Sequence, residues 1–215
     1  MPNLAHSVWN AADLVAIDLE GSGAQDRDNE AILEIALVPI IDGHTEPGAA
    51  FSTLINPERT IPRRPWISPG LTNTTLAQAP TLDQVKSDIV TRVSGKLLVG
   101  HNVNVDWRLL QRRIPAAEAT GLIDTLRLVK ARHPAMTSYK LTDCVAALNL
   151  TGAVDAAVPA GHPHRALWDA VAAALLLEKL VDSPHEINEL INDAAFPPSG
   201  ATAAHGEPDQ QQGLW

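Results

Sequence analysis

Two carboxylates stand one residue apart at the end of an apolar run, in the stretch LVAIDLEGSG (14–23). In a β-strand, residues i and i+2 point to the same face, so Asp18 and Glu20 would project side by side. Like charges this close repel each other unless one is protonated or a cation lies between them. Carboxylate oxygens are hard ligands that suit Mg²⁺ or Mn²⁺. The pair therefore predicts a divalent-metal site, with a solvent-exposed strand end as the alternative for an isolated Asp-x-Glu.

A third acid lies on a predicted helix beside core residues. In LLVGHNVNVDWRLL (97–110), a buried strand ends and a helix begins, and Asp106 shares a helix face with Leu109 and Leu110. Burying a carboxylate alone costs too much, so Asp106 must be paired or bound to a metal. A salt bridge or a hydrogen-bonded supporting role is the alternative to direct metal binding.

A fourth acid, Asp169, lies in the first turns of the apolar helix predicted within GHPHRALWDAVAAALLLEKL (161–180). His164 precedes it by five residues, which is about 140° around an α-helix, so the two side chains would diverge if both were helical. If His164 instead lies at the helix start or on the loop before it, its imidazole can turn towards Asp169. His162 is the competing histidine.

The apolar pattern predicts the elements that must position these side chains. Runs rich in Val, Ile and Leu indicate strands, the first three joined as an antiparallel meander by short polar segments. The predicted strands are 14–19, 31–41, 49–55, 96–100 and 121–124. Helices are predicted at 81–93, 104–113, 124–132, 141–148, 165–181 and 184–193. Strands followed by interleaved helices and strands indicate an α/β sheet covered by helices.

The length of 215 residues and the apolar content of 45% suit one domain with a tail. We expect the domain over 1–182, a C-terminal helix over 183–196 and a disordered tail over 197–215. Residues 56–80 contain five prolines and predict a long irregular loop.

Charge and composition narrow the class of protein. The formal net charge is −9, whereas nucleic-acid-binding proteins are usually basic. Five of the acids, and no Lys or Arg, lie after residue 182, so the domain itself is less acidic than the whole chain. Bound cations would neutralise further negative charge in the domain. The single Cys144 cannot form an internal disulfide, the first residues lack a secretory pattern, and no apolar run approaches the ~20 residues that span a bilayer. These features predict a cytoplasmic location without a membrane partner.

Taken in order, the motifs Asp-x-Glu, Gly-His-Asn-x-x-x-Asp and His-x-Ala-x-x-Asp-Ala resemble those of the DEDDh 3'→5' exonucleases. This family of the ribonuclease H-like superfamily includes the polymerase III proofreading subunit, ribonuclease T and oligoribonuclease. The resemblance covers about residues 13–181, with further matches in ILEIALV, INP, IDTLRL and SYKLTDCVAAL. It implies a ribonuclease H-like fold, with a central mixed five-stranded sheet flanked by helices. It also implies an enzyme that releases nucleoside 5'-monophosphates from a 3' end.

The resemblance also implies roles for individual residues. Four acids would hold two divalent cations, Mg²⁺ or Mn²⁺, for an in-line hydrolysis in which one histidine is the general base. The metal-binding acids are Asp18, Glu20, Asp106 and Asp169. The family spacing of five residues before the last acid selects His164 over His162 as the base. The implied substrate contacts are Gly21, Ser22, Gly23, His101 and Asn102.

Trp66 lies in the proline-rich loop near Arg59, Arg63 and Arg64, a combination that suits single-strand binding by stacking and phosphate contact. Packing of Trp66 on the domain surface is an equally open interpretation. The final residues, QQGLW (211–215), loosely resemble the peptides by which replication proteins bind a sliding clamp. The tail is therefore a candidate contact for a replication or repair partner, with chance similarity as the alternative.

Single-stranded DNA or a 3' overhang is the predicted substrate, and RNA or short oligoribonucleotides are the alternative. The sequence does not separate them, because sugar discrimination depends on the pocket around a 2'-hydroxyl. A nucleic-acid-binding or interaction module on the same fold is the alternative from another class, and the complete acid set argues against it. Two departures concern substrate contacts: GSG replaces Thr-Thr-Gly after Glu20, and WISPGLT (66–72) stands where a His-Gly-Ile-Thr-like segment is frequent.

Overall fold

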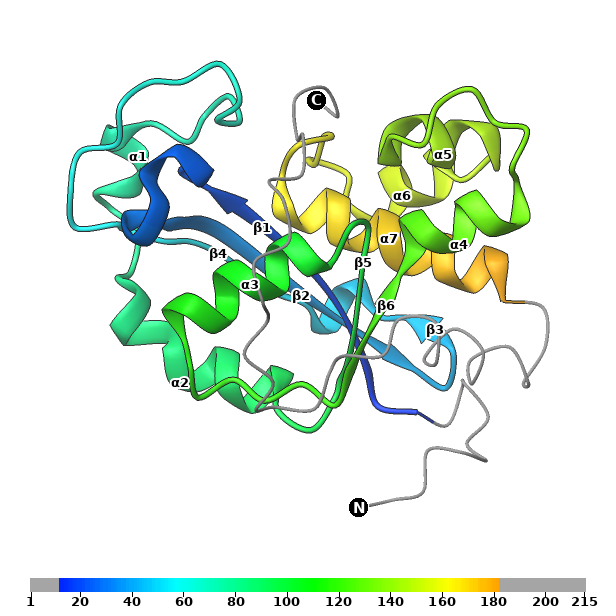
Figure 1. Ribbon diagram of the computed structural model, residues 1–215, viewed down its shortest axis with the longest axis horizontal. Helices are drawn as coiled ribbons and strands as arrows, with labels where there is room; N and C mark the ends of the chain where they lie inside the picture. The colour runs from blue at the N-terminus through cyan, green and yellow to red at the C-terminus, as the bar shows by residue number, and fades with distance from the viewer. Residues whose placement is uncertain (1–11, 182–215) are drawn as a thin grey trace, which may run out of the picture.

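The computed structural model describes residues 12–181, which form one mixed β-sheet flanked by helices (Figure 1). The strands are β1 Leu14–Gly21, β2 Ile32–Ile41, β3 His44–Thr45, β4 Phe51–Leu54, β5 Leu97–Gly100 and β6 Gly121–Asp124. The order across the sheet is β3-β2-β1-β5-β6, and β4 also pairs with β2. Strand β2 is antiparallel to both β1 and β4, whereas β5 is parallel to β1 and to β6. The predicted meander and mixed sheet are confirmed, and the two-residue β3 is an addition to the five predicted strands.

The helices follow the predicted pattern closely. They are α1 Asn73–Leu76, α2 Leu82–Val93, α3 Asn104–Arg113, α4 Thr125–Arg132, α5 Leu141–Ala147, α6 Thr151–Ala157 and α7 Ala166–Leu180, with 3-10 helices η3 Ala24–Asn29 and η4 Pro47–Ala49. At the start of α2 the backbone N–H of Thr81 donates to Gln84 Oε1 at 2.8 Å, one half of a capping box. The short α1 and α6 were not predicted, because each buries a single side chain and so shows no helical period.

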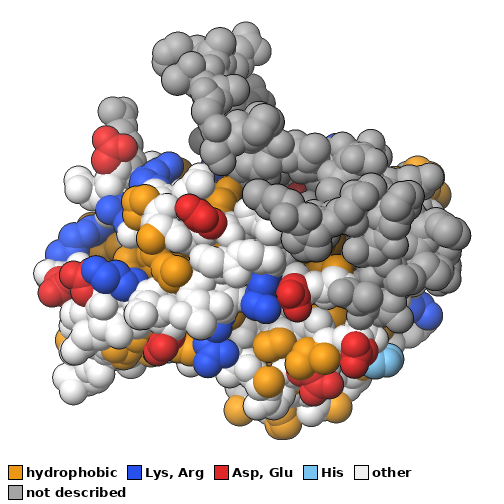
Figure 2. All heavy atoms as spheres, turned by 90° about the horizontal axis from the view of Figure 1, so that it is seen from below, with side chains coloured by type: hydrophobic (Ala, Val, Ile, Leu, Met, Phe, Trp, Pro, Cys, Tyr) orange, Lys and Arg blue, Asp and Glu red, His pale blue; other side chains and the backbone are white. Residues whose placement is uncertain are grey.

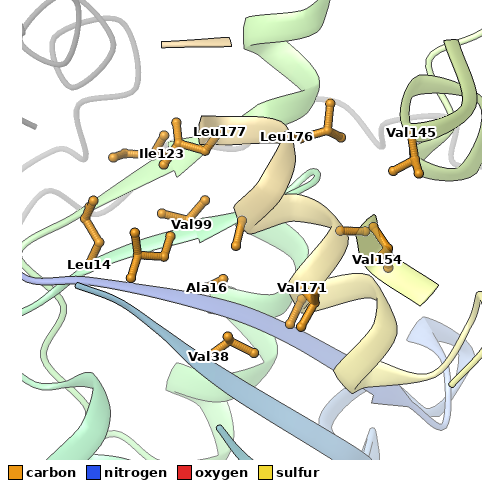
Figure 3. Packing of buried hydrophobic residues seen from close by; sticks show 14 of the residues in the cluster. Leu14, Ala16, Val38, Val99, Ile123, Val145, Val154, Val171, Leu176 and Leu177 are labelled. Carbon is orange, nitrogen blue, oxygen red and sulfur yellow. The ribbon is translucent and has the colours of Figure 1, made fainter. Parts of the chain in front are cut away.

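Alternation along β1 divides its side chains between two hydrophobic cores. Leu14 and Ala16 pack with residues of α7 (Figure 3), whereas Val15 and Ile17 pack with residues of α2 and α3. Five buried alanines give α7 a small profile against the sheet; they are Ala166, Ala170, Ala172, Ala173 and Ala174. Side chains at even positions of β1 therefore face α7.

The face seen in Figure 2 carries acidic and basic side chains interspersed over the described residues, without a broad basic area. Within residues 12–181 no helix has the length and apolar character needed to cross a bilayer. The predicted helix over 183–196, the tail over 197–215 and the clamp-like QQGLW lie outside the described residues, so the division of the chain beyond the domain stays a prediction.

Candidate active site

Strand β1 extends beyond its parallel neighbour β5. Strand β5 pairs with residues 14–16 of β1, so the second half of β1 has β2 on one side and no strand on the other. Asp18 and Glu20 continue the side-chain series of Ala16 towards α7. Directly opposite them on β2 stand Ala36 and Glu34, respectively. The small Ala36 leaves room beside Asp18, and Glu34 adds a further carboxylate to the same face.

The first turn of α3 occupies the place that β5 leaves beside β1. The backbone N–H of Leu19 donates to Asp106 Oδ1 at 2.9 Å, which replaces a missing strand hydrogen bond. Gly100, the last residue of β5, lets the end of β5 lie close to the backbone of β1, since a β-carbon there would lie 3.0 Å from the carbonyl oxygen of Ile17. Asp106 is 8% exposed, so the predicted buried carboxylate has a backbone partner and lies next to β1.

Helix α7 adds an acid from the opposite end of the sequence. Carboxylate oxygens of Asp18, Glu20 and Asp169 lie within 4.8 Å of one another. Asp106 is close enough that its negative charge raises the pKa of Asp18. All four predicted metal ligands are thus brought together by β1, α3 and α7, elements that lie far apart along the chain.

Burial and mutual repulsion raise the pKa of every acid in this group. Desolvation, followed by the charges of Asp169 and Glu34, raises the pKa of Glu20 to about 8. Desolvation is also the main cause that raises the pKa values of Asp106 and Asp169 to about 7. The pKa of Asp18 is raised well above its usual range by burial and then by its acidic neighbours. At neutral pH the group therefore favours either protons or a bound cation.

His164 lies on the turn before α7, whose N-cap is Arg165. Its backbone N–H donates to Asp169 Oδ2 at 3.0 Å, and its side chain is exposed. The residue has φ of 64°, so it is not part of the helix and does not follow the angular spacing that would separate it from Asp169. The competing His162 is exposed, and its ring Nδ1 donates to the neighbouring carbonyl of Pro163 at 2.9 Å.

Two further residues at the site were missed in the sequence. Glu34, which is 4% exposed, accepts hydrogen bonds at 2.8 Å from both Nε and Nη2 of Arg165. Arg165 also lowers the pKa of Glu20, which makes it a counter-charge within the acid group. The available signal was an acid inside the apolar run ILEIALVPII together with an arginine next to His164.

Among the predicted substrate contacts, Ser22 requires a revision. It is fully buried, its N–H donates to the carbonyl of Ala31, and its Oγ accepts from the N–H of Ala31, both at 2.9 Å. Its hydroxyl also hydrogen-bonds Asp26, which is the main cause that lowers the pKa of that acid. Ser22 therefore closes the loop between β1 and β2 and offers no surface to a substrate. Gly21 and Gly23 are partly exposed, and their contacts with substrate stay a prediction.

Trp66 of the proline-rich loop packs against the loop between β1 and β2. A β-carbon at Gly23 would lie 2.5 Å from Trp66 Nε1, so the indole packs directly on this glycine. The guanidinium of Arg64 lies 5.3 Å from the centre of the Trp66 ring. Arg64 and Arg59 each pair with Asp26, at 3.0 and 3.1 Å, instead of standing free for phosphate. Trp66 is thus half-buried against the loop that follows β1, and its stacking on a base stays a prediction.

His101 and Asn102 lie at the junction of β5 and α3. Both ring nitrogens of His101 bond within the protein, Nδ1 to Thr125 Oγ1 at 3.0 Å and Nε2 to the carbonyl of Tyr139 at 2.8 Å. Burial lowers the pKa of His101, which favours the neutral ring. The ring therefore ties β5 to α4 rather than reaching a substrate. The N–H of Asn102 donates to the buried Asp124 at 2.9 Å, and a substrate contact of its side chain stays a prediction.

Comparisons with known proteins agree with this arrangement. The exonuclease family model matches residues 15–177. A DNA polymerase III subunit epsilon-like protein of Rhodobacter capsulatus is 29% identical over 174 residues, which are 80% of this chain and 24% of that protein. DNA polymerase III subunit epsilon of Aquifex aeolicus is 28% identical over 173 residues, 78% of this chain and 80% of that protein. The chain thus spans about a quarter of the first relative and most of the second.

The solved structure of exonuclease X in complex with 5' overhanging duplex DNA is 27% identical, has a TM-score of 0.58, and is matched over 84% of this chain and 98% of that one. The family match, the shared fold and the meeting of four acids beside a histidine lead to one conclusion. The chain belongs to the exonuclease family, with the acid motifs and the ribonuclease H-like fold of its DEDDh type.

Proposed function

We propose that this chain hydrolyses the terminal phosphodiester bond at the 3' end of a DNA strand and releases nucleoside 5'-monophosphates one at a time. The observation that carries the proposal is the meeting of the Asp18, Glu20 and Asp169 oxygens within 4.8 Å, beside the exposed His164. An acid group of this kind, buried at neutral pH, is expensive unless it binds cations, and a purely structural role does not require it.

The donor set fits divalent metal ions. Every group in it is a carboxylate, the ligand type that Mg²⁺ and Mn²⁺ favour. Burial and neighbouring acids raise the pKa values of Glu20 and Asp169, and a bound cation would oppose this rise. We infer that Asp18, Glu20, Asp106 and Asp169 hold two such ions. When bound, the ions would polarise the phosphate and favour ionisation of a water molecule.

The residues of the chain supply orientation and proton transfer. The backbone bond from Leu19 fixes Asp106 at the edge of β1, so this acid is held in place before any ligand arrives. His164, exposed on the turn before α7, would accept the proton of the attacking water at a ring nitrogen. Arg165 neutralises Glu34 next to Glu20, which limits the negative charge that an incoming phosphate must meet.

DNA is the proposed substrate because relatives at 28–29% identity are named as DNA polymerase III epsilon or epsilon-like proteins, and a structure at 27% identity holds duplex DNA with an overhang. A single strand or a 3' overhang fits the need to bring a free 3' end to the acid group. A repair or proofreading role is the corresponding biological setting.

The test is a hydrolysis assay on matched DNA and RNA oligomers of one sequence, labelled at the 5' end, with Mg²⁺, with Mn²⁺ and with EDTA. We expect stepwise shortening of DNA from the 3' end in the presence of metal, and release of 5'-monophosphates. Asp18→Ala is the inactive control. Faster cleavage of RNA would transfer the assignment to an exoribonuclease, and internal cuts in a circular single strand would refute exonuclease action.

A further inference from the structure

The backbone around His164 is held by residues from three separate parts of the fold. Its N–H donates to Asp169 on α7, its carbonyl oxygen accepts a hydrogen bond from the hydroxyl of Ser68, and the next residue, Arg165, forms a two-point pair with Glu34. His164 has φ of 64°, a left-handed conformation that residues with a β-carbon rarely adopt. Such a conformation persists where the surrounding contacts impose it.

Ser68 comes from a firmly packed part of the proline-rich loop. It is 5% exposed and lies 96 residues before His164 in the sequence. Asn73 braces the loop, since its side chain accepts from the N–H of Ile61 at 2.8 Å and donates to the carbonyl of Ile61 at 3.0 Å. A small core beneath the loop contains Leu33, Ile61, Leu71 and Leu76. The Ser68 hydroxyl is therefore presented from a rigid surface, which a hydrogen bond needs if it is to impose a backbone conformation.

Glu34 provides the second fixed point. Its strand position is set by pairing with Glu20 on β1 and with Leu54 on β4, so the carboxylate stands in the middle of the sheet. Besides its two bonds to Arg165, it lies 3.4 Å from the N–H of Ala166, the first residue of α7. The pair thus fixes where α7 begins, two residues after His164.

We propose that Ser68 and the Glu34–Arg165 pair are positioning residues that hold His164 in its left-handed conformation and so present the imidazole at the acid group. The proposal rests on the role of His164 as general base given under the proposed function. None of the three residues needs to touch the substrate. The effect of Ser68 passes through the His164 turn, which makes it separable from metal binding and from DNA binding, whereas the Glu34–Arg165 pair also carries charge beside Glu20.

The test uses Ser68→Ala, which removes the hydroxyl that reaches His164. Its matched control is Thr75→Ala, which removes hydroxyl bonds to Gly70 and Thr72 inside the same loop and leaves His164 untouched. Loss of one positioning hydrogen bond should lower the single-turnover rate constant, and kcat with it, about three- to ten-fold. We expect KM for the DNA oligomer and the Mg²⁺ half-saturation to stay within about two-fold, and Thr75→Ala to keep the wild-type kcat.

A double-mutant cycle decides whether Ser68 acts through His164. In a His164→Ala background, the Ser68→Ala change should alter the residual rate by less than about two-fold. A full loss in that background, or a wild-type kcat for Ser68→Ala alone, overturns the proposal. A wild-type rate for His164→Ala itself would remove the general-base assignment, and with it this proposal, which is a different result from the first two.

Arg165→Lys is a second variant that keeps the positive charge and loses the two-point geometry. It should reduce kcat about ten-fold, again without a matching rise in KM, and its effect should also shrink in the His164→Ala background. Equal losses in both backgrounds would show that Arg165 supports the fold or the acid group directly, and would overturn its positioning role.

Discussion

Replacing Glu20 by Gln should stabilise the metal-free protein at alkaline pH while abolishing its activity. Burial and the neighbouring acids raise the pKa of Glu20 from the ordinary 4.5 to about 8. A group whose pKa is higher in the folded than in the unfolded state stabilises the fold below the unfolded pKa, and this stability is lost as pH rises through the folded pKa. The wild-type protein without metal should therefore lose stability between about pH 4.5 and pH 8.

The two pKa values set the size of the effect. At about 1.4 kcal/mol per pH unit, their separation limits the loss from Glu20 to about 5 kcal/mol at pH 8 and above. Asp18 and Asp169 compete for the same protons, so we expect Glu20→Gln to recover roughly 2 kcal/mol. For a domain of this size that corresponds to a rise in Tm of about 4–8 °C.

The assay is thermal unfolding in EDTA at pH 5, 6, 7 and 8, for the wild type, Glu20→Gln and the control Glu118→Gln at an exposed position. The Tm difference between Glu20→Gln and wild type should be small at pH 5 and grow up to pH 8, and Mg²⁺ should reverse its sign by stabilising the wild type. A Tm difference that does not change with pH, or one that Glu118→Gln shares, would refute the reasoning.

Three further results are expected. Mg²⁺ at about 100 times its Kd should stabilise the wild type by roughly 2.7 kcal/mol, a Tm rise of about 5–11 °C, and Asp18→Asn should lose most of this rise in the same melts. His164→Ala should lower the single-turnover rate by ~10²-fold or more and retain the Mg²⁺-dependent Tm rise; near-normal turnover would contradict the general-base role. Gly23→Ala should destabilise the fold by about 1–3 kcal/mol, because φ is 102° and the new β-carbon would lie 2.5 Å from Trp66 Nε1. The control Gly48→Ala has nothing within 4 Å of its new β-carbon and should leave Tm unchanged.

Local patterns in the sequence were sufficient for most of the strands and helices and for the acid motifs. The period of two in β1 placed Asp18 and Glu20 on one face, and the apolar period of α7 placed Asp169 among buried residues, because both periods are properties of a few neighbouring residues. The order of the acid motifs indicated the family before the fold was known. The helix ends at α3 and α4 were predicted to within one residue.

Tertiary structure decided how the site is closed. The early end of β5 lets Asp106 reach the backbone of Leu19, and Glu34 meets Arg165 across a separation of 131 residues. It also turned Ser22 inward and brought the loop with Ser68 against His164. None of these contacts produces a periodic pattern in the sequence, since each depends on where two distant segments pack. The sequence by itself predicted the acids and the histidine to which we assign the chemistry, whereas only the packing of distant segments determined which residues hold them in place.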